Sequence, residues 1–221
     1  MEGLVRIVAL GDSLTAGYMS PATDLEWPPY QPYTRFLEEM ILDATAKKRK
    51  SIRLQIINKG LNGDLTEGML NRFDRDVLQL SPSQVIVLGG TNDIGWGIPV
   101  TSIYSNLEEM YDKAIRYGIL LIACAVPSIL GYDSLIPPRV RLNRMIRSYC
   151  EAKGAKYVDL FSATADPETK RLSPKYANDG LHLSAEGYRK VAETVFKEAF
   201  LPLTNTLTAN LGIRAARQER I

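Results

Sequence analysis

The chain has 221 residues, 45% of them hydrophobic and 24% charged, which is typical of one globular domain with a well-buried core. Its 27 basic and 25 acidic residues leave a formal net charge of +2, so the charge balance gives no case for nucleic-acid binding. One histidine and two scattered cysteines form no CxxC motif and make no transition-metal site.

Apolar runs rich in β-branched residues alternate along the chain with segments of helical periodicity. Nearly continuous apolar runs suit strands of a parallel sheet buried on both faces, and the alternation predicts right-handed βαβ units. The predicted fold class is therefore α/β, a three-layer α/β/α sandwich. In chain order the elements are strand 4–10, helix 32–47, strand 54–58, helix 65–80, strand 84–88, a helix with an apolar stripe over 103–115, strand 118–126, helix 138–153, strand 156–160 and a helix with a stripe over 188–199.

No internal repeat or linker divides this pattern, so we predict a single domain over residues 1–201. Residues 202–221 form a polar tail, for which we expect either disorder or a short extra helix. Cys124 falls in the fourth strand and Cys150 in the fourth long helix. We expect two buried thiols, with a disulfide as the alternative.

Signals for export or membrane insertion are missing from the sequence. Residues 1–10 carry no basic n-region and too short an apolar stretch for a signal peptide. No window approaches the 18 apolar residues that a transmembrane helix needs. We therefore expect a cytoplasmic protein, and the alternative is a leader already removed.

Four polar, glycine-bearing segments follow predicted strands or precede the last helix. They occupy residues 11–13, 58–64, 89–93 and 178–182. In an open α/β sheet, ligands bind beyond the carboxyl ends of the strands. We therefore expect these segments to form one site.

The only histidine, His182, lies in the last of these segments, three residues after Asp179. Ser13 follows the first strand. A serine hydroxyl is a feeble nucleophile unless a base removes its proton, and an aspartate can orient an imidazole for that task. These three residue types are the parts of an activated nucleophile.

The run Gly11-Asp12-Ser13-Leu14 resembles the motif that names the GDSL, or SGNH, hydrolases. Ser13 corresponds to the S of SGNH, and Gly63, Asn92 and His182 correspond to its G, N and H. The resemblance covers residues 4–200 and is greatest to the compact bacterial thioesterase/lysophospholipase and arylesterase type. It implies a flavodoxin-like fold with a five-stranded parallel sheet of order 2-1-3-4-5. It also implies hydrolysis of carboxylic esters without a metal or other cofactor.

The same resemblance implies a role for each residue of the site. Ser13 is expected as the nucleophile, His182 as the general base and later acid, and Asp179 as the residue that orients the imidazole. The implied oxyanion hole consists of the N–H groups of Ser13 and Gly63 and the side-chain amide of Asn92. Gly60 is the alternative to Gly63, and Asp12 and Asp93 are expected to support the loops by hydrogen bonds.

Substrate selection should lie in three loops that carry apolar side chains beside this site. We expect them to form a hydrophobic cleft for an acyl or aryl group of a small ester or thioester. The candidate lining residues are Trp27, Tyr30, Trp96, Ile129, Leu130 and Tyr132.

Two other functions remain open at this stage. One is an esterase that acts on acetylated carbohydrate, and the other is a non-catalytic binding domain on the same fold. The nucleophile elbow of α/β-hydrolases is excluded, because Ser13 is not followed by x-Gly. A flavodoxin-type cofactor site lacks support, since no phosphate-binding glycine-rich loop is evident.

Overall fold

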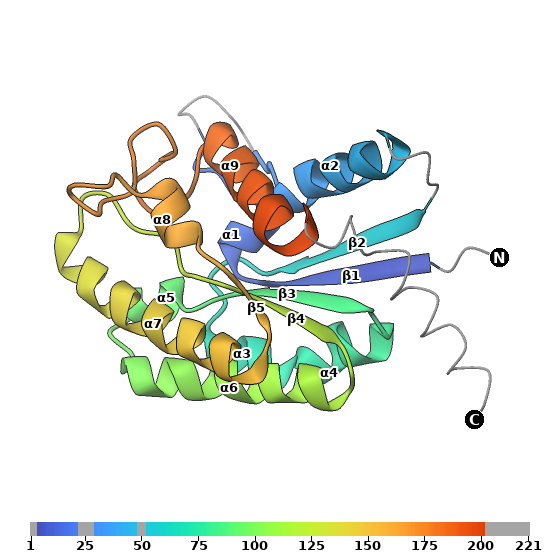
Figure 1. Ribbon diagram of the computed structural model, residues 1–221. Coiled ribbons are helices and arrows are strands. Elements are labelled where there is room, and N and C mark those ends of the chain that lie inside the picture. The colour runs from blue at the N-terminus through green and yellow to red at the C-terminus, as the bar shows by residue number, and fades with distance from the viewer. Residues whose placement is uncertain (1–3, 22–28, 48–51, 202–221) are drawn as a thin grey trace.

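A five-stranded parallel sheet forms the middle layer of the protein (Figure 1). The computed structural model describes residues 4–21, 29–47 and 52–201. The sheet order β2-β1-β3-β4-β5 confirms the predicted topology. Its strands are β1 (Leu4–Gly11), β2 (Arg53–Gly60), β3 (Gln84–Leu88), β4 (Leu120–Cys124) and β5 (Lys156–Val158).

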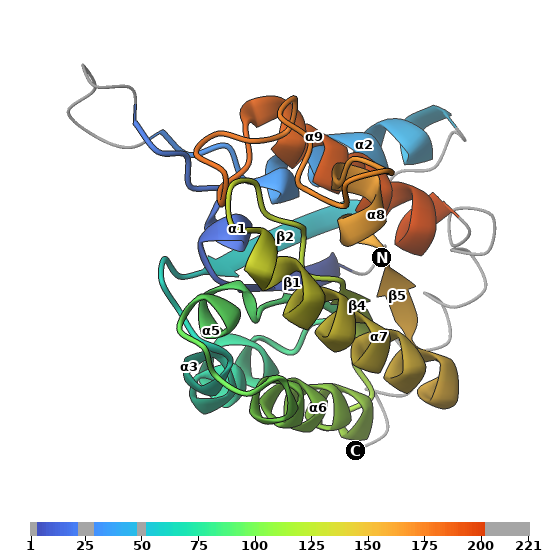
Figure 2. The same cartoon turned by 90° about the vertical axis from the view of Figure 1, so that its left-hand side faces the viewer.

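Helices cover both faces of the sheet, so the three-layer sandwich is also confirmed (Figures 1 and 2). One face carries α2 (Tyr33–Lys47), α8 (Leu160–Thr164) and α9 (Ala185–Val195), which a π turn extends over Phe196–Phe200. The other face carries α3 (Thr66–Asn71), α4 (Phe73–Asp76), α6 (Val100–Arg116) and α7 (Ile136–Lys153). The short helices α1 (Ser13–Ala16) and α5 (Thr91–Gly95) lie where β1 and β3 end.

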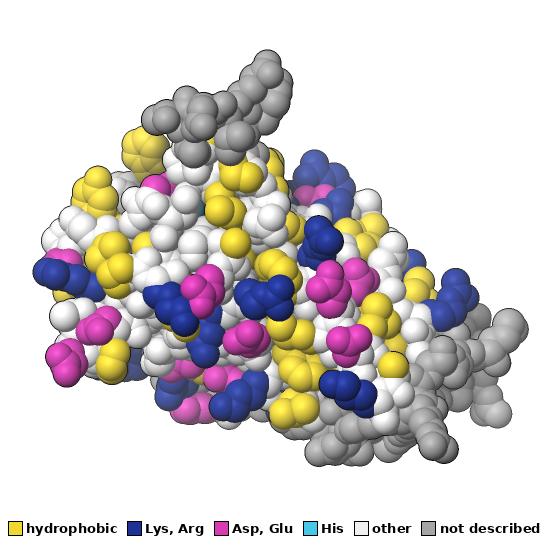
Figure 3. All heavy atoms as spheres, turned by 90° about the horizontal axis from the view of Figure 1, so that it is seen from above, with side chains coloured by type: hydrophobic (Ala, Val, Ile, Leu, Met, Phe, Trp, Pro, Cys, Tyr) yellow, Lys and Arg dark blue, Asp and Glu magenta, His cyan; other side chains and the backbone are white. Residues whose placement is uncertain are grey.

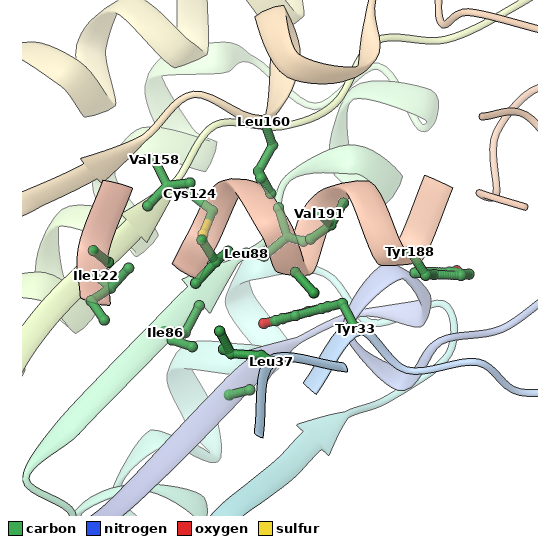
Figure 4. Close-up of a cluster of buried hydrophobic side chains, with 14 of the residues drawn as sticks. Tyr33, Leu37, Ile86, Leu88, Ile122, Cys124, Val158, Leu160, Tyr188 and Val191 are labelled. Carbon is green, nitrogen blue, oxygen red and sulfur yellow. The ribbon is translucent and has the colours of Figure 1, made fainter. Parts of the chain in front are cut away.

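Alternating side chains of each central strand enter two separate cores, which explains the continuous apolar runs in the sequence. In β1, Ile7 and Ala9 belong to the core under α2 and α9, and Val8 and Leu10 belong to the core under α3, α6 and α7. Figure 4 shows part of the first core, where side chains of α2 and α9 meet those of β3 and β4.

The two cysteines belong to different cores, Cys124 to the one in Figure 4 and Cys150 to the other. Both are free and buried. The expected buried thiols are confirmed, and the alternative of a disulfide is wrong because the sheet separates the two side chains.

The register of the sheet aligns the carboxyl ends of β1, β2 and β3. Gly11 at the end of β1 pairs with Gly60 of β2 and with Leu88 of β3. The segments that follow these strands therefore leave the sheet at the same edge, which faces the viewer in Figure 2.

Four details differ from the sequence-based expectations. The helix expected over 65–80 is broken into α3, α4 and a 3₁₀ turn (Leu78–Leu80), with the break at Arg72. Strand β2 is not fully buried, since it lies at the sheet edge and only β1 pairs with it. Ile115, expected in the apolar stripe of α6, is 40% exposed. The segment with His182 does not follow β5 directly, because α8 and a long loop intervene.

The surface over α2, α8 and α9 carries basic and acidic side chains side by side (Figure 3). This distribution agrees with the near-neutral net charge and lacks the concentrated basic face that nucleic acid requires. None of the helices in the described ranges is long and apolar enough to cross a membrane. The predicted tail, 202–221, lies outside the described residues.

Candidate active site

Ser13 lies in a tight turn where β1 passes into α1. Asp12 caps this helix by accepting a hydrogen bond from the Leu14 N–H at 2.9 Å. The Ser13 N–H, in the first turn, has no partner within the helix. A glycine is required at position 11, because a Cβ there would collide with the Thr15 side chain and the Leu88 carbonyl. The turn therefore holds Ser13 at the end of a rigid strand.

His182 joins Ser13 to Asp179 through a chain of hydrogen bonds. The Ser13 Oγ lies 3.0 Å from the His182 Nε2, although 169 residues separate the two in sequence. The His182 Nδ1 lies 2.7 Å from one carboxylate oxygen of Asp179. The other oxygen accepts the backbone N–H groups of Leu181 at 3.0 Å and His182 at 2.7 Å. The structure thus brings together all three residues that the sequence singled out.

Asp179 is held ionised by these contacts. Partial burial acts to raise the pKa of its carboxyl, but the hydrogen bonds from His182 and Leu181 outweigh that effect and the net pKa is lowered. A charged carboxylate at Nδ1 fixes the orientation of the imidazole and favours its cationic form.

The segment that carries Asp179 and His182 is shaped locally and docks on the loop after β4. Gly180 has a φ of +91° and a Cβ there would collide with the Leu130 carbonyl. The Leu130 N–H donates to the Gly180 carbonyl at 2.9 Å, and the Asn178 N–H donates to the His182 carbonyl at 2.8 Å. The glycine thus permits the close approach that places His182 over the sheet edge.

Tyr18 contacts both the nucleophile turn and the imidazole, and the sequence analysis did not single it out. Its backbone N–H donates to the Ser13 carbonyl at 3.1 Å. Its ring centroid lies 4.6 Å from that of His182, with the planes inclined at 60°. Its position five residues after Ser13 was the only signal available in the sequence.

Gly63 and Gly60 differ in the state of their N–H groups. The Gly60 N–H donates to the Asn58 side chain at 2.8 Å, and a Cβ on Gly60 would collide with the Ala16 backbone. Gly63 has a φ of +74°, and no acceptor for its N–H is found within the described residues. Gly60 is therefore a packing glycine, and Gly63 keeps a donor available for a ligand.

Asn92 and Asp93 tie the segment after β3 to the segment after β2. The Asn92 Nδ2 donates to the Asp64 carbonyl at 2.9 Å, which leaves its second N–H for a ligand. The Asp93 carboxylate accepts the Thr66 N–H at 3.1 Å and the Thr66 hydroxyl at 2.6 Å. Through these bonds Asp93 holds the segment after β3 against the start of α3, and the sequence had suggested a supporting role of this kind.

Arg72 forms a buried clamp behind these loops that sequence reasoning missed. Its side chain, only 10% exposed, pairs with Asp64 at 2.8 Å and with Asp76 at 3.0 Å. Its guanidinium also donates to the carbonyls of Lys59 at 3.0 Å and Gly11 at 2.9 Å. These bonds connect the ends of β1 and β2 next to Ser13 and Gly63.

Arg72→Met should lower the free energy of unfolding by about 3–5 kcal/mol, because the buried Asp64 carboxylate would lose its ion-pair partner and Asp76 would keep only Arg75 and Lys59. Urea denaturation followed by circular dichroism measures this change. Arg75→Met is the matched control, since Arg75 also pairs with Asp76 but is 70% exposed and should cost at most about 1 kcal/mol. Equal effects of the two variants would show that Arg72 is not a clamp.

Asp12 is fully buried, and one of its carboxylate oxygens has no partner among the described residues. Burial, together with the smaller effect of the Asp93 and Asp64 charges, raises the pKa of Asp12 to about 7 against the hydrogen bond from Leu14. Between about pH 4 and pH 7 the folded protein therefore binds more protons than the unfolded chain. The free energy of unfolding should fall as the pH rises through this window.

Asp12→Asn should remove that contribution, because the amide oxygen still caps Leu14 but nothing at position 12 titrates. At pH 8 the variant should gain on the order of 2 kcal/mol in stability relative to the unchanged protein. Thermal unfolding from pH 5 to pH 8 measures the difference, with Asp74→Asn as an exposed control. A difference that stays constant across this range would contradict the raised pKa.

The residues expected to line a substrate cleft differ in exposure. Tyr30, Trp96 and Tyr132 are 47%, 79% and 63% exposed. Ile129 is buried with 3% exposed, and Leu130 packs partly against the core. Trp27 lies outside the described residues. No group of three or more metal-ligating side chains occurs within the described ranges.

The sequence of this chain is similar to a known family and to two known proteins. A model of the GDSL-like lipase/acylhydrolase family matches residues 9–190. An arylesterase from Vibrio mimicus is 26% identical over 204 residues, which cover 87% of each chain. An uncharacterized lipoprotein, YqeF, from Bacillus subtilis is 31% identical over 219 residues, which cover 94% of this chain and 84% of the relative.

Solved structures show the same fold. A GDSL-like lipase from Bacteroides thetaiotaomicron superposes with a TM-score of 0.69 at 22% identity, over 87% of this chain and 86% of that one. An acetyl xylan esterase from Geobacillus stearothermophilus reaches 0.73 at 17% identity, over 88% and 94% of the two chains. The matched family model spans the segments that carry Ser13, Gly63, Asn92 and His182. The chain therefore belongs to the GDSL-like lipase/acylhydrolase family and is a hydrolase of carboxylic esters.

Proposed function

We propose that this protein hydrolyses esters through an acyl-enzyme on Ser13. The observation that supports this most is the hydrogen-bonded chain from the Ser13 Oγ to the His182 Nε2 at 3.0 Å and from the His182 Nδ1 to Asp179 at 2.7 Å. In the first step the imidazole takes the hydroxyl proton while the Oγ attacks the ester carbonyl carbon. The resulting imidazolium is stabilised by the Asp179 carboxylate.

The remaining steps complete acylation and then return the protein to its starting state. The imidazolium of His182 donates its proton to the leaving alcohol as the bond between carbonyl carbon and alcohol oxygen breaks. Water then attacks the acylated Ser13, again with His182 as the base, and releases the carboxylic acid. Each proton taken by His182 is thus given back within the same half-reaction.

The tetrahedral oxyanion is assigned in this proposal to three donors: the N–H groups of Ser13 and Gly63 and the side-chain amide of Asn92. The donors lie on three segments that the Arg72 clamp and the Asp64 carbonyl connect. A preorganised donor of this kind contributes about 3 kcal/mol to the transition state.

Asn92→Ala should therefore lower kcat about 10²- to 10³-fold with little change in KM. Asn92→Asp keeps the shape of the side chain but loses the N–H donor, so it should be impaired at least as much. Steady-state kinetics with p-nitrophenyl acetate measures both variants. A fall in kcat of less than about fivefold in both would remove Asn92 from the oxyanion hole.

The substrates proposed here are small esters or thioesters with a short- to medium-chain apolar acyl group or an aryl group. The support is the set of exposed aromatic side chains on the loops around Ser13, among them Tyr30, Trp96 and Tyr132. Aromatic side chains that stay accessible at a site provide apolar contact area for a ligand.

The experiment that tests this proposal traps the acyl-enzyme. Acid quenching during the burst with p-nitrophenyl acetate, followed by peptide mass spectrometry, should find acetyl on the peptide with Ser13. Acetyl on another residue, or on none, would contradict it. A panel of p-nitrophenyl esters of increasing length, acyl-CoAs, a lysophospholipid and acetylated sugars then defines the acyl preference. Activity confined to the acetylated sugars would identify a carbohydrate esterase instead.

The cytoplasmic location stays a prediction. One relative, from Bacillus subtilis, is named a lipoprotein. Fractionation of the native host with an antibody against the protein measures the location directly.

A further inference from the structure

Tyr18 and Tyr30 form an aromatic surface beside the imidazole, called here the Tyr18–Tyr30 wall. The Tyr18 ring lies against His182, with the centroids 4.6 Å apart. The Tyr30 ring contacts Tyr18 edge to face, with the centroids 5.9 Å apart and the planes at 78°. Tyr18 is partly buried, and Tyr30 is 47% exposed. The wall therefore begins at the imidazole and ends at a ring that a ligand can reach.

Backbone hydrogen bonds fix the wall to the rest of the site. Residues 18 and 30 form an antiparallel β-bridge, and the Gln31 N–H donates to the Gly17 carbonyl at 2.7 Å. The Tyr188 hydroxyl donates to the Tyr18 carbonyl at 2.6 Å. The Asn62 side chain donates to the Tyr30 hydroxyl at 2.8 Å, next to Gly63. The two rings thus keep their positions between the imidazole and the segment after β2.

The chemistry of the reaction places the alcohol part of the ester on this side, an argument that rests on the proposed function. The carbonyl oxygen must point toward Ser13 N–H, Gly63 and Asn92. The oxygen of the leaving alcohol must lie within hydrogen-bond reach of the His182 Nε2, because that atom gives it a proton. The first atoms of the alcohol therefore lie beside the imidazole, and the aromatic side chain packed against the imidazole is Tyr18.

We infer that the Tyr18–Tyr30 wall receives the alcohol portion of the ester and selects alcohols that carry an aromatic ring. Tyr30 already packs edge to face on Tyr18, and its exposed part offers the same kind of contact to a ligand ring. Such pairs form at centroid distances of 4.5–7 Å and are more favourable than contact with a saturated ring of equal size. Neither ring adds a charge to the wall, which suits a neutral alcohol.

The test compares benzyl acetate with cyclohexylmethyl acetate. The two esters share the acetyl group, have alkoxide leaving groups of similar basicity and differ in the aromaticity of the ring. The unchanged protein should prefer benzyl acetate in kcat/KM. Tyr30→Leu should reduce that preference about threefold to tenfold, because it removes one aromatic pair. Tyr30→Phe and Tyr30→Trp keep a ring and should keep the preference.

A second readout separates binding of the alcohol from damage to the site. Both esters form the same acetyl-enzyme, and the hydrolysis of that intermediate no longer involves the alcohol. Tyr30→Leu should therefore leave the deacylation rate unchanged, as measured after the burst. Tyr117→Leu is the matched control, because Tyr117 is 64% exposed at the end of α6, before β4 begins. It should change neither the preference nor the deacylation rate.

Several results would overturn this inference. An equal loss on both esters, or slower deacylation in Tyr30→Leu, would mean that Tyr30 acts through Asn62 on the oxyanion segment. An unchanged preference in Tyr30→Leu would mean that the alcohol does not touch the wall.

Two further variants separate the wall from its surroundings. Asn62→Ala removes the bond to Tyr30 while keeping the ring, so a changed preference in Asn62→Ala would also count against the inference. Hydrolysis that persists in Ser13→Ala would overturn the proposed function itself. If Ser13→Ala is inactive and Tyr30→Leu keeps the preference for benzyl acetate, only the inference about the wall is overturned.

Discussion

Ser13→Ala should lower kcat/KM for p-nitrophenyl acetate about 10⁴- to 10⁶-fold and leave the fold intact. The loss should be large because the proposed mechanism forms its covalent intermediate only on Ser13. The residual rate reflects only binding and the oxyanion donors. The fold should persist, since the Ser13 hydroxyl bonds to His182 and the cap of α1 is made by Asp12.

The measurement needs a preparation free of host esterases and a fold check by thermal unfolding. Ser148→Ala is a suitable control, because Ser148 is an exposed serine on α7 and its loss should change neither activity nor stability. More than about 1% residual activity in clean Ser13→Ala, with a normal Tm, would exclude Ser13 as the nucleophile.

His182→Ala should lower kcat by a similar factor, about 10⁴-fold or more, because it removes both the base and the acid of the mechanism. Asp179→Asn should cost about 10⁴-fold as well, since the amide cannot stabilise the imidazolium and favours the wrong tautomer. The two variants act on one hydrogen-bonded chain, so their effects should not add.

A comparison of pH–rate profiles gives an independent check on His182. The unchanged protein and His182→Ala should have different profiles, because the variant lacks the proposed base and the chain has one histidine. The lowered pKa of Asp179 keeps its carboxylate charged in the unchanged protein. Identical profiles would identify another base.

The Arg72 clamp shows how stability and catalysis are connected in this fold. One guanidinium binds the Gly11 carbonyl, one residue before Asp12, and the Asp64 carboxylate, one residue after Gly63. A change at Arg72 should therefore lower the stability of the fold. It should also make the distance between Ser13 and Gly63 more variable. Stability and kcat should fall together in Arg72→Met, whereas Asn92→Ala should lower kcat with a smaller loss of stability, because it removes one partly buried hydrogen bond.

The sequence by itself determined the succession of strands and helices along the chain and the fold class, and it indicated the candidate catalytic residues. It could do so because these features are local. Apolar runs mark the strands, glycine-bearing polar segments mark their ends, and Asp179 reaches His182 within one turn. Ser13 follows β1, and the segment with His182 docks on the loop after β4 at the same edge of the sheet, so the two residues meet across 169 residues.

Only the tertiary structure decided which further residues hold the site together and which side chains a ligand can reach. Arg72 gave no local signal for a clamp, because its partner carbonyl at Gly11 lies 61 residues away. The free N–H of Gly63, the burial of Ile129 and the packing of Tyr18 on His182 likewise depend on contacts between distant segments. The sequence pattern predicted one helix over 65–80, whereas the structure has α3 and α4 on either side of Arg72. The sequence indicates the candidate reacting groups, and the contacts between loops set their geometry and their surroundings.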